Sequence, residues 1–252
     1  RTGFHAFAES ISVSKKADSA ILNFSEGIRL VSSEGFRISA SEGIVILSTK
    51  GFPELPREIN REEVTAGKLP KLPEVSFSKE RIKLLQLSGS VVVKSRDFTL
   101  SGRALETRNG GDNWNLVGDF SLVLSDGSGR SVLGRNLFYD RTAGRVTTVN
   151  PVQISGFTKT TERVTLNASK IVFDVRGKVF SLTGSARISF GDYLLSSREI
   201  LANLKTMVLE TTGDATLITG ESVVKAEKIR IQIEDGRVKV SASGVSGSVR
   251  VR

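Results

Sequence analysis

One short pattern returns along the chain about every 30 residues. It begins with a glycine or proline and continues with apolar residues spaced by two, as in "GSVVV" at Gly89, "GSARISF" at Gly184 and "GDATLI" at Gly213. Further copies start at Gly118, Pro151 and Gly244. A fixed period of this length is typical of a protein that stacks one small structural unit many times. The repeat constrains the fold more than any other feature of the sequence.

Each repeat predicts about four short β-strands. Apolar residues at every second position indicate a strand with one buried face. The starting run is followed by a second run such as "YLLSS" and a third such as "KIVFDV", and a reversal at Arg176-Gly177 or Asp235-Gly236 leads to a closing run. A unit with one apolar face cannot cover that face alone, so neighbouring units must stack and curl. We therefore expect an all-β, elongated and twisted structure with an apolar interior along its length.

A proline-rich segment interrupts this pattern. Four of the five prolines of the chain fall within residues 51–76, and proline interrupts regular hydrogen bonding. Residues 1–50 show the same alternating style as the repeats of 77–252. We expect an N-terminal β-repeat segment over 1–50, a linker or excursion over 51–76, and β repeats over 77–252 that continue the first segment.

The charge balance favours anionic partners. The formal net charge is +9, and basic proteins attract nucleic acid, acidic lipid headgroups or phosphorylated glycolipid. Aromatic residues make up 6% of the chain and are mostly phenylalanine, whereas nucleic-acid modules interleave basic residues with exposed stacking aromatics. We therefore expect no nucleic-acid partner. The start at Arg1 fits a processed product whose export signal or anchor has been removed.

The sequence offers little for catalysis. His5 is the only histidine, there is no cysteine, and most carboxylates sit beside turns, where they bond their own backbone. The glycines of "DGSGRSVLG" do not have the spacing of a dinucleotide-binding loop, and the pattern predicts a hairpin loop there. We predict a protein that is not an enzyme and has no catalytic residues, no cofactor and no metal site.

Two longer stretches carry a family resemblance. "SKIVFDVRGKVFSLTGSARISFGDYLLSSREI" and "ILANLKTMVLETTGDATLITGESVVKAEKIRIQIEDGRVKVSASG" resemble the OstA-like repeat of periplasmic lipopolysaccharide-transport proteins, the LptA and LptC type and the N-terminal domain of LptD. Their shared pattern is alternating apolar residues around Asp, Gly and a second Gly. It fits best over 166–244, fairly over 89–155, and only in style before Gly51.

The resemblance implies a slit β-jelly-roll of stacked antiparallel strands, V-shaped in section, that holds lipid A acyl chains inside and leaves headgroup phosphates outside. It also implies a periplasmic location and transport of lipopolysaccharide, or another envelope lipid, towards the outer membrane. Other jelly-roll transport components would join by edge-strand pairing, and copies of the chain could join head to tail. Transport of this kind needs a continuous apolar lining and no catalytic group.

We expect lipid contact from inward-facing residues of the repeats, chiefly the first-strand pairs. These residues are Val91, Val93, Phe98, Leu100, Phe120, Leu122, Ile171, Phe173, Ala186, Ile188, Phe190, Ala215 and Leu217. Two other hypotheses fit the repeats. One is a structural β-solenoid, surface-layer or adhesin-type protein without lipid cargo. The other is a carbohydrate-active enzyme on a parallel β-helix, which would need a carboxylate or basic cluster on one face that these repeats do not supply.

Overall fold

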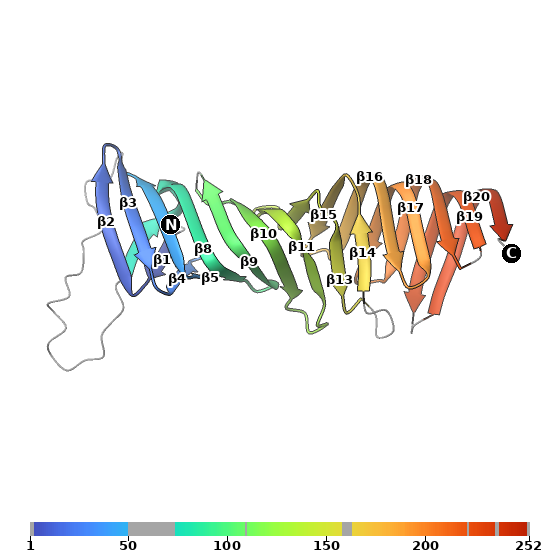
Figure 1. Cartoon of the computed structure of the whole chain (residues 1–252), viewed down its shortest axis with the longest axis horizontal. Helices are drawn as coiled ribbons and strands as arrows, with labels where there is room; N and C mark the ends of the chain where they lie inside the picture. Colours follow the sequence, from blue (N-terminus) through green and yellow to red (C-terminus); the bar gives the residue numbers. More distant parts are fainter. Residues whose placement is uncertain are drawn as a thin grey trace. The chain divides into compact units, whose positions relative to one another are not determined.

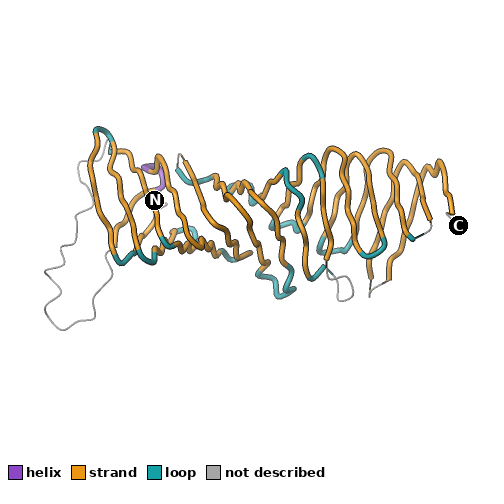
Figure 2. The backbone as a smooth tube through the Cα atoms, in the orientation of Figure 1, coloured by secondary structure: helices purple, strands orange, loops and turns teal. Residues whose placement is uncertain are grey.

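The computed structural model describes residues 3–49, 74–108, 110–157, 163–220, 222–234 and 237–250. Figure 2 shows that strands make up nearly all of it, as predicted. Every strand pair with a resolved register is antiparallel, for example β16 (Val179–Phe190) with β17 (Tyr193–Asn203). The prediction of an all-β antiparallel fold is confirmed.

The chain divides into two compact units, residues 1–118 (unit 1) and 119–252 (unit 2). Unit 1 contains β1 Gly3–Phe7, β2 Ser10–Lys16, β3 Ser19–Ser25, β4 Ile28–Ser32, β5 Arg37–Ala40, β6 Glu42–Ser48, β7 Glu74–Ser78, the 3-10 helix η2 Lys79–Arg81, β8 Ile82–Lys94 and β9 Phe98–Arg108. The strand β10 Asn113–Leu124 contains the boundary. Unit 2 continues with β11 Ser131–Asp140, β12 Arg145–Thr148, β13 Val152–Ser155, β14 Arg163–Asn167, β15 Lys170–Asp174, β16, β17, β18 Val208–Thr219, β19 Ser222–Glu234 and β20 Arg237–Arg250 (Figure 1).

Unit 1 joins strands from both sides of the proline-rich segment. β6 pairs with the first half of β8, and β5 pairs with its second half, where Ile38 lies opposite Val93. The end of the segment expected as an excursion, from Glu74 onwards, forms β7, which pairs with β1. The rest of that segment, residues 51–73, lies outside the described residues.

The glycine at the start of a repeat lies inside a long strand. β16 passes through Gly184: its first half pairs with β15, its second half pairs with β14, and its register with β17 shifts between Thr183 and Ala186. Such bulges bend a strand and increase its twist. The closing strand of one repeat and the first strand of the next are thus a single bent strand.

Gly184 is required at this bend for two reasons. Its φ is +77°, a backbone conformation that residues with a side chain rarely adopt. A Cβ at this position would also lie 2.7 Å from the Ser169 hydroxyl, which donates a hydrogen bond to the Gly184 carbonyl. Unit 1 repeats this arrangement, since the Ser41 hydroxyl donates to the carbonyl of Gly89, whose φ is +72°.

The bends fold the sheet of unit 2 over on itself into two walls. The first wall contains β12, β15 and the first half of β16, and the second contains β13, β14 and the second half of β16. A straight β11 would hold its ends about 30 Å apart. Yet Asp126, in the loop before β11, forms an ion pair with Lys178. Gly144, in the turn after β11, accepts a hydrogen bond from the amide of Val175, which belongs to the same turn as Lys178. Both ends of the strand therefore meet at one side, the mouth of the fold.

Candidate functional site

All thirteen residues predicted to contact lipid point into the interior of their unit. None is more than 4% exposed. Four of them belong to β8 and β9 in unit 1, and nine belong to β10, β15, β16 and β18 in unit 2. The structure shows their burial, and their contact with lipid stays a prediction.

The unit 1 residues form part of one inner wall. Val93 lies between Ile38 on β5 and Leu100 on β9, and directly opposite residues share a face of the sheet. Val91, two residues before Val93 and closer to the bend at Gly89, lies opposite Gly102. This sequence of pairs gives a continuous apolar stripe across three strands.

The unit 2 residues near β10 and β15 meet around one small cavity. Phe120, Leu122, Ile171 and Phe173 line it together with Phe180, and its volume is about 10 Å³. The rings of Phe173 and Phe180 stack with their centroids 4.2 Å apart. A cavity of this size holds at most one water molecule. The interior is closed and filled by side chains at this level.

The remaining unit 2 residues cross the second wall in rows. Ile188 lies opposite Leu195, which in turn lies opposite Leu217. The row next to the bend places Ala186 and Ala215 on either side of Ser197. The inward side chains are therefore small next to the bend and larger farther from it.

Several interior residues were missed by the sequence reasoning. Phe180 and Leu182 are no more than 1% exposed and belong to the first half of β16, and Val164 and Leu166 are equally buried on β14. The same alternation that marked the first-strand pairs also marks "KVFSLT" and "VTLNA". That signal could have found these residues if every strand of the repeat had been used.

Three stacked turns form the rim of the first wall. They span residues 141–144, 175–178 and 204–207, and each connects two strands. The Gly144 carbonyl accepts a hydrogen bond from the Val175 amide, and the Lys178 carbonyl accepts one from the Leu204 amide. Val175 and Leu204 are 3% and 0% exposed, so they close the interior at the mouth.

A hairpin loop from the second wall crosses the mouth to these turns. The loop, residues 125–130, connects β10 and β11. It contains the first part of "DGSGRSVLG", which was predicted to be a hairpin loop, whereas the last four residues of that stretch belong to β11. Asp126 forms an ion pair with Lys178. The Arg130 guanidinium donates to the Leu204 carbonyl at 2.8 Å and contacts the Met207 sulfur at 3.4 Å. We call these contacts the mouth contacts of unit 2.

The Asp126 carboxylate should make stability depend on pH. The hydrogen bond from Lys178, followed by that from Ser128, holds the pKa of Asp126 well below its usual range. A carboxyl with a lowered pKa in the folded state stabilises the fold above its unfolded pKa of about 3.9, and this contribution is lost as the pH falls. We expect Asp126→Asn to lower the free energy of unfolding by about 1–2 kcal/mol at pH 7. This loss of stability should become smaller as the pH is lowered from 4 to 2.

Urea unfolding of both proteins across this pH range measures the difference. Asp192→Asn, which changes an exposed carboxylate in the β16–β17 turn, is the matched control. A difference between Asp126→Asn and the unsubstituted protein that stays constant down to pH 2 would contradict the assignment.

Charged and aromatic contacts also surround the short helix of unit 1. Lys79 in η2 forms ion pairs with Asp112, which follows β9, and with Glu34, between β4 and β5, at 3.8 Å. Phe36 packs edge-on against Trp114 with ring centroids 5.1 Å apart, and the Trp114 indole is fully buried. Loops from three parts of unit 1 thus meet around η2.

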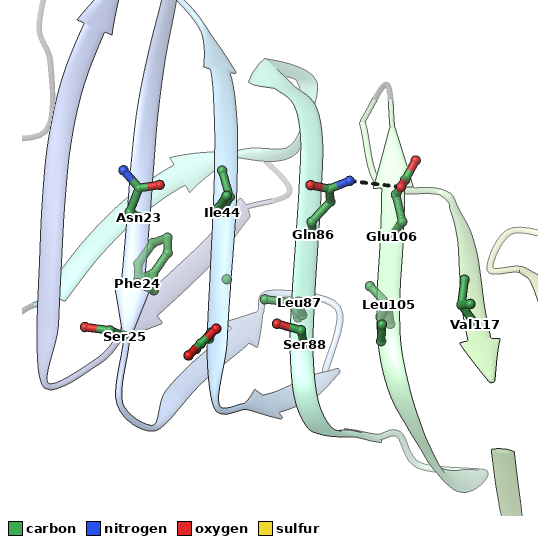
Figure 3. Close-up of a pocket in the computed structure, with 13 residues that line it drawn as sticks. Asn23, Phe24, Ser25, Ile44, Gln86, Leu87, Ser88, Leu105, Glu106 and Val117 are labelled. Atoms are coloured by element: carbon green, nitrogen blue, oxygen red, sulfur yellow. Dashed lines mark hydrogen bonds between the residues drawn. The ribbon is translucent and has the colours of Figure 1, made fainter. Parts of the chain in front are cut away.

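A separate hollow of about 450 Å³ lies on the outer face of unit 1. Figure 3 shows Asn23, Ile44, Gln86 and Glu106 in a row across β3, β6, β8 and β9, and small Gly43 deepens the surface beside them. Gln86 donates a 3.0 Å hydrogen bond to Glu106, which holds the pKa of that carboxyl below its usual value. None of the thirteen predicted residues lines this hollow.

The described residues offer no cluster of metal ligands. They contain no group of three or more His, Asp or Glu side chains placed to hold a metal ion. His5 lies exposed on β1, with its Nδ1 2.9 Å from the Ser76 hydroxyl. Among all the residues that the structure describes, no helix has the length and apolar character that crossing a membrane requires.

Comparison with known proteins finds likeness in structure but none in sequence. No protein-family model matches the chain, and no curated protein matches it in sequence. Among solved structures, the chain is similar to LptH of Pseudomonas aeruginosa, described as the LptA-homologous periplasmic component of the lipopolysaccharide transport device. The two are 11% identical, the match covers 52% of this chain and 71% of LptH, and the TM-score is 0.24.

Proposed function

We propose that the chain is a non-enzymatic, periplasmic lipid-binding protein that carries the acyl chains of lipopolysaccharide, or of another envelope lipid, between the walls of its folded sheets. The observation that carries the proposal is the interior of unit 2. Apolar side chains from two walls face each other there, and charged loops meet at the mouth. An amphipathic lipid has the same division into apolar chains and a charged head.

Lipid would enter by separating side chains that now pack together. The stacked rings of Phe173 and Phe180 occupy the space that an acyl chain would take. Each CH₂ group buried from water contributes about 0.8 kcal/mol, so a chain of a dozen carbons could offset the loss of several side-chain contacts. The net charge of +9 would attract phosphorylated headgroups to the outside.

Exposed strand edges support the proposed joining of domains. β20 pairs with β19, and Val240 of β20 lies directly opposite Ile231 of β19. The inward-facing apolar row that contains Ile231 therefore continues onto β20. Ile231 is fully buried, whereas Val240 is 43% exposed. An uncovered apolar face beside an edge strand favours pairing with another strand. We propose that another jelly-roll component, or a second copy joined head to tail, pairs at this edge.

The filled interior favours a second candidate function. A structural or adhesin-type protein would use the same repeats for length and would need no cavity, and the cavity of about 10 Å³ is consistent with that use. Such a protein would yield no lipid on extraction with organic solvent and would bind no apolar probe.

Binding of intact and deacylated lipopolysaccharide separates the two candidates. We expect native mass spectrometry to show a complex of the purified chain with intact lipopolysaccharide, and no complex with the same molecule after its acyl chains are removed. Equal binding of both forms would assign the interaction to surface charge, and absence of any complex would favour the structural role.

A further inference from the structure

The three turns on the rim of the first wall share a position that favours glycine. The last residue of each turn has a positive φ: +67° at Gly144, +58° at Lys178 and +54° at Met207. A residue with a side chain adopts this left-handed conformation less readily than glycine does. Two of the three turns therefore carry a side chain where the backbone disfavours one.

Both of these side chains contact the same loop. Lys178 forms the ion pair with Asp126, and the Met207 sulfur contacts the Arg130 guanidinium. Gly144, the third residue of the series, has no part in the mouth contacts. The disfavoured side chains are thus the two that reach across the mouth to residues 125–130.

The loop is shaped by its own hydrogen bonds. The Asp126 carboxylate accepts a 2.9 Å bond from the Ser128 amide, and the Arg130 carbonyl accepts a 3.0 Å bond from the Leu124 amide. These bonds do not involve the opposite rim. The loop can therefore leave the turns as one preformed piece without losing its internal structure.

The mouth contacts are few and partly open to water. The side chains of Lys178 and Asp126 are 23% and 21% exposed, so salt and solvent screen their attraction to some degree. Beneath them, the buried Val175 and Leu204 close the interior. Release of a small set of polar contacts would expose this apolar closure while the hydrogen-bonded walls stay intact.

We propose that residues 125–130 form a latch, which closes the mouth of unit 2 and must release before an apolar chain can enter. The latch rests on the proposed lipid function for its purpose, but its opening can be measured without lipid. Removing the latch should open the mouth locally, while the interior at the bend stays protected.

Thiol labelling of single cysteines tests this directly, because the chain contains no cysteine of its own. Val175→Cys places a reporter at the mouth, and Ala215→Cys places one near the bend, where Ala215 is 3% exposed. Each is combined with the latch variant Asp126→Asn/Arg130→Met. We expect labelling at the mouth to become about tenfold faster, the factor for losing one charge-assisted hydrogen bond, with no change near the bend.

The matched control removes an ion pair from the outer face of the same unit. Glu210→Gln breaks the 2.7 Å pair of Glu210 with Arg230 and should change neither labelling rate. Unchanged labelling at the mouth in the latch variant would overturn the proposal. Equal acceleration at both reporters would overturn it as well, because the contacts would then stabilise unit 2 as a whole.

A fatty-acid probe keeps this test separate from the lipid proposal. In the same variants without cysteines, 11-(dansylamino)undecanoic acid reports entry into an apolar interior by its fluorescence. We expect faster uptake in the latch variant than in the Glu210→Gln control. Faster mouth labelling together with no probe uptake in any form would contradict the lipid function and leave the latch established.

Discussion

Phe180→Ala should lower the free energy of unfolding by about 3–5 kcal/mol. Phe180 is 1% exposed and stacks on Phe173 beside a cavity of only about 10 Å³. Truncation removes the buried ring and leaves a space that the hydrogen-bonded walls cannot readily fill. Urea or thermal unfolding of the whole chain, followed by circular dichroism, measures the loss.

Phe138→Ala is the control for this prediction. Phe138 is 40% exposed on the outer side of β11, so we expect its truncation to cost about 1 kcal/mol or less. Similar losses at the two positions would show that the interior of unit 2 is not tightly packed, and the account of a closed interior would be wrong.

Gly184→Ala should lower the free energy of unfolding by about 2–4 kcal/mol. The methyl group would have to adopt a φ of +77° and would meet the Ser169 hydroxyl at 2.7 Å. Relief of that contact would disturb the hydrogen bond that the Ser169 hydroxyl gives to the Gly184 carbonyl at the bend. Equilibrium unfolding by urea measures the effect.

Gly191→Ala separates the two costs. Gly191 also has a positive φ, +51°, but no atom lies within 4 Å of the position of its Cβ. We expect this substitution to cost about 1 kcal/mol, the conformational cost alone. If Gly184→Ala were no more costly than Gly191→Ala, the close packing of β16 against Ser169 at the bend would be disproved.

Alternation and period were sufficient to predict the all-β class and the inward faces. Ile188 and Leu217 could be assigned to the interior because a strand alternates its two faces regardless of its partners. The turn at Arg176-Gly177 was recognisable because glycine between alternating runs marks a reversal. These features depend on local sequence, which the repeat displays several times.

The bends and the mouth could not be predicted in the same way. A glycine with positive φ can end a strand or bend it, and only the pairing of β16 with both β14 and β15 distinguishes these cases. The ion pair of Asp126 with Lys178 joins residues that are far apart in sequence. Their approach depends on the folding of the whole sheet, so the sequence pattern of either turn alone carries no sign of it.

The boundary between the compact units depends on packing contacts that could not be predicted from the sequence. We expected the proline-rich segment 51–76 to be a linker or excursion within one continuous run of repeats, and the two compact units divide elsewhere, between Gly118 and Asp119 within β10. No composition shift marks that position, because a strand on either side of it has the same alternating pattern. The division reflects which strands pack together.

Photolabelling with a lipid that carries a diazirine in its acyl chain tests the central claim most directly. After irradiation of its complex with the full chain, mass spectrometry of the peptides identifies the labelled residues. We predict labels on inward residues such as Ile188 and Leu217. Labels confined to outward residues such as Arg187 and Thr216 would contradict the claim that acyl chains occupy the space between the walls.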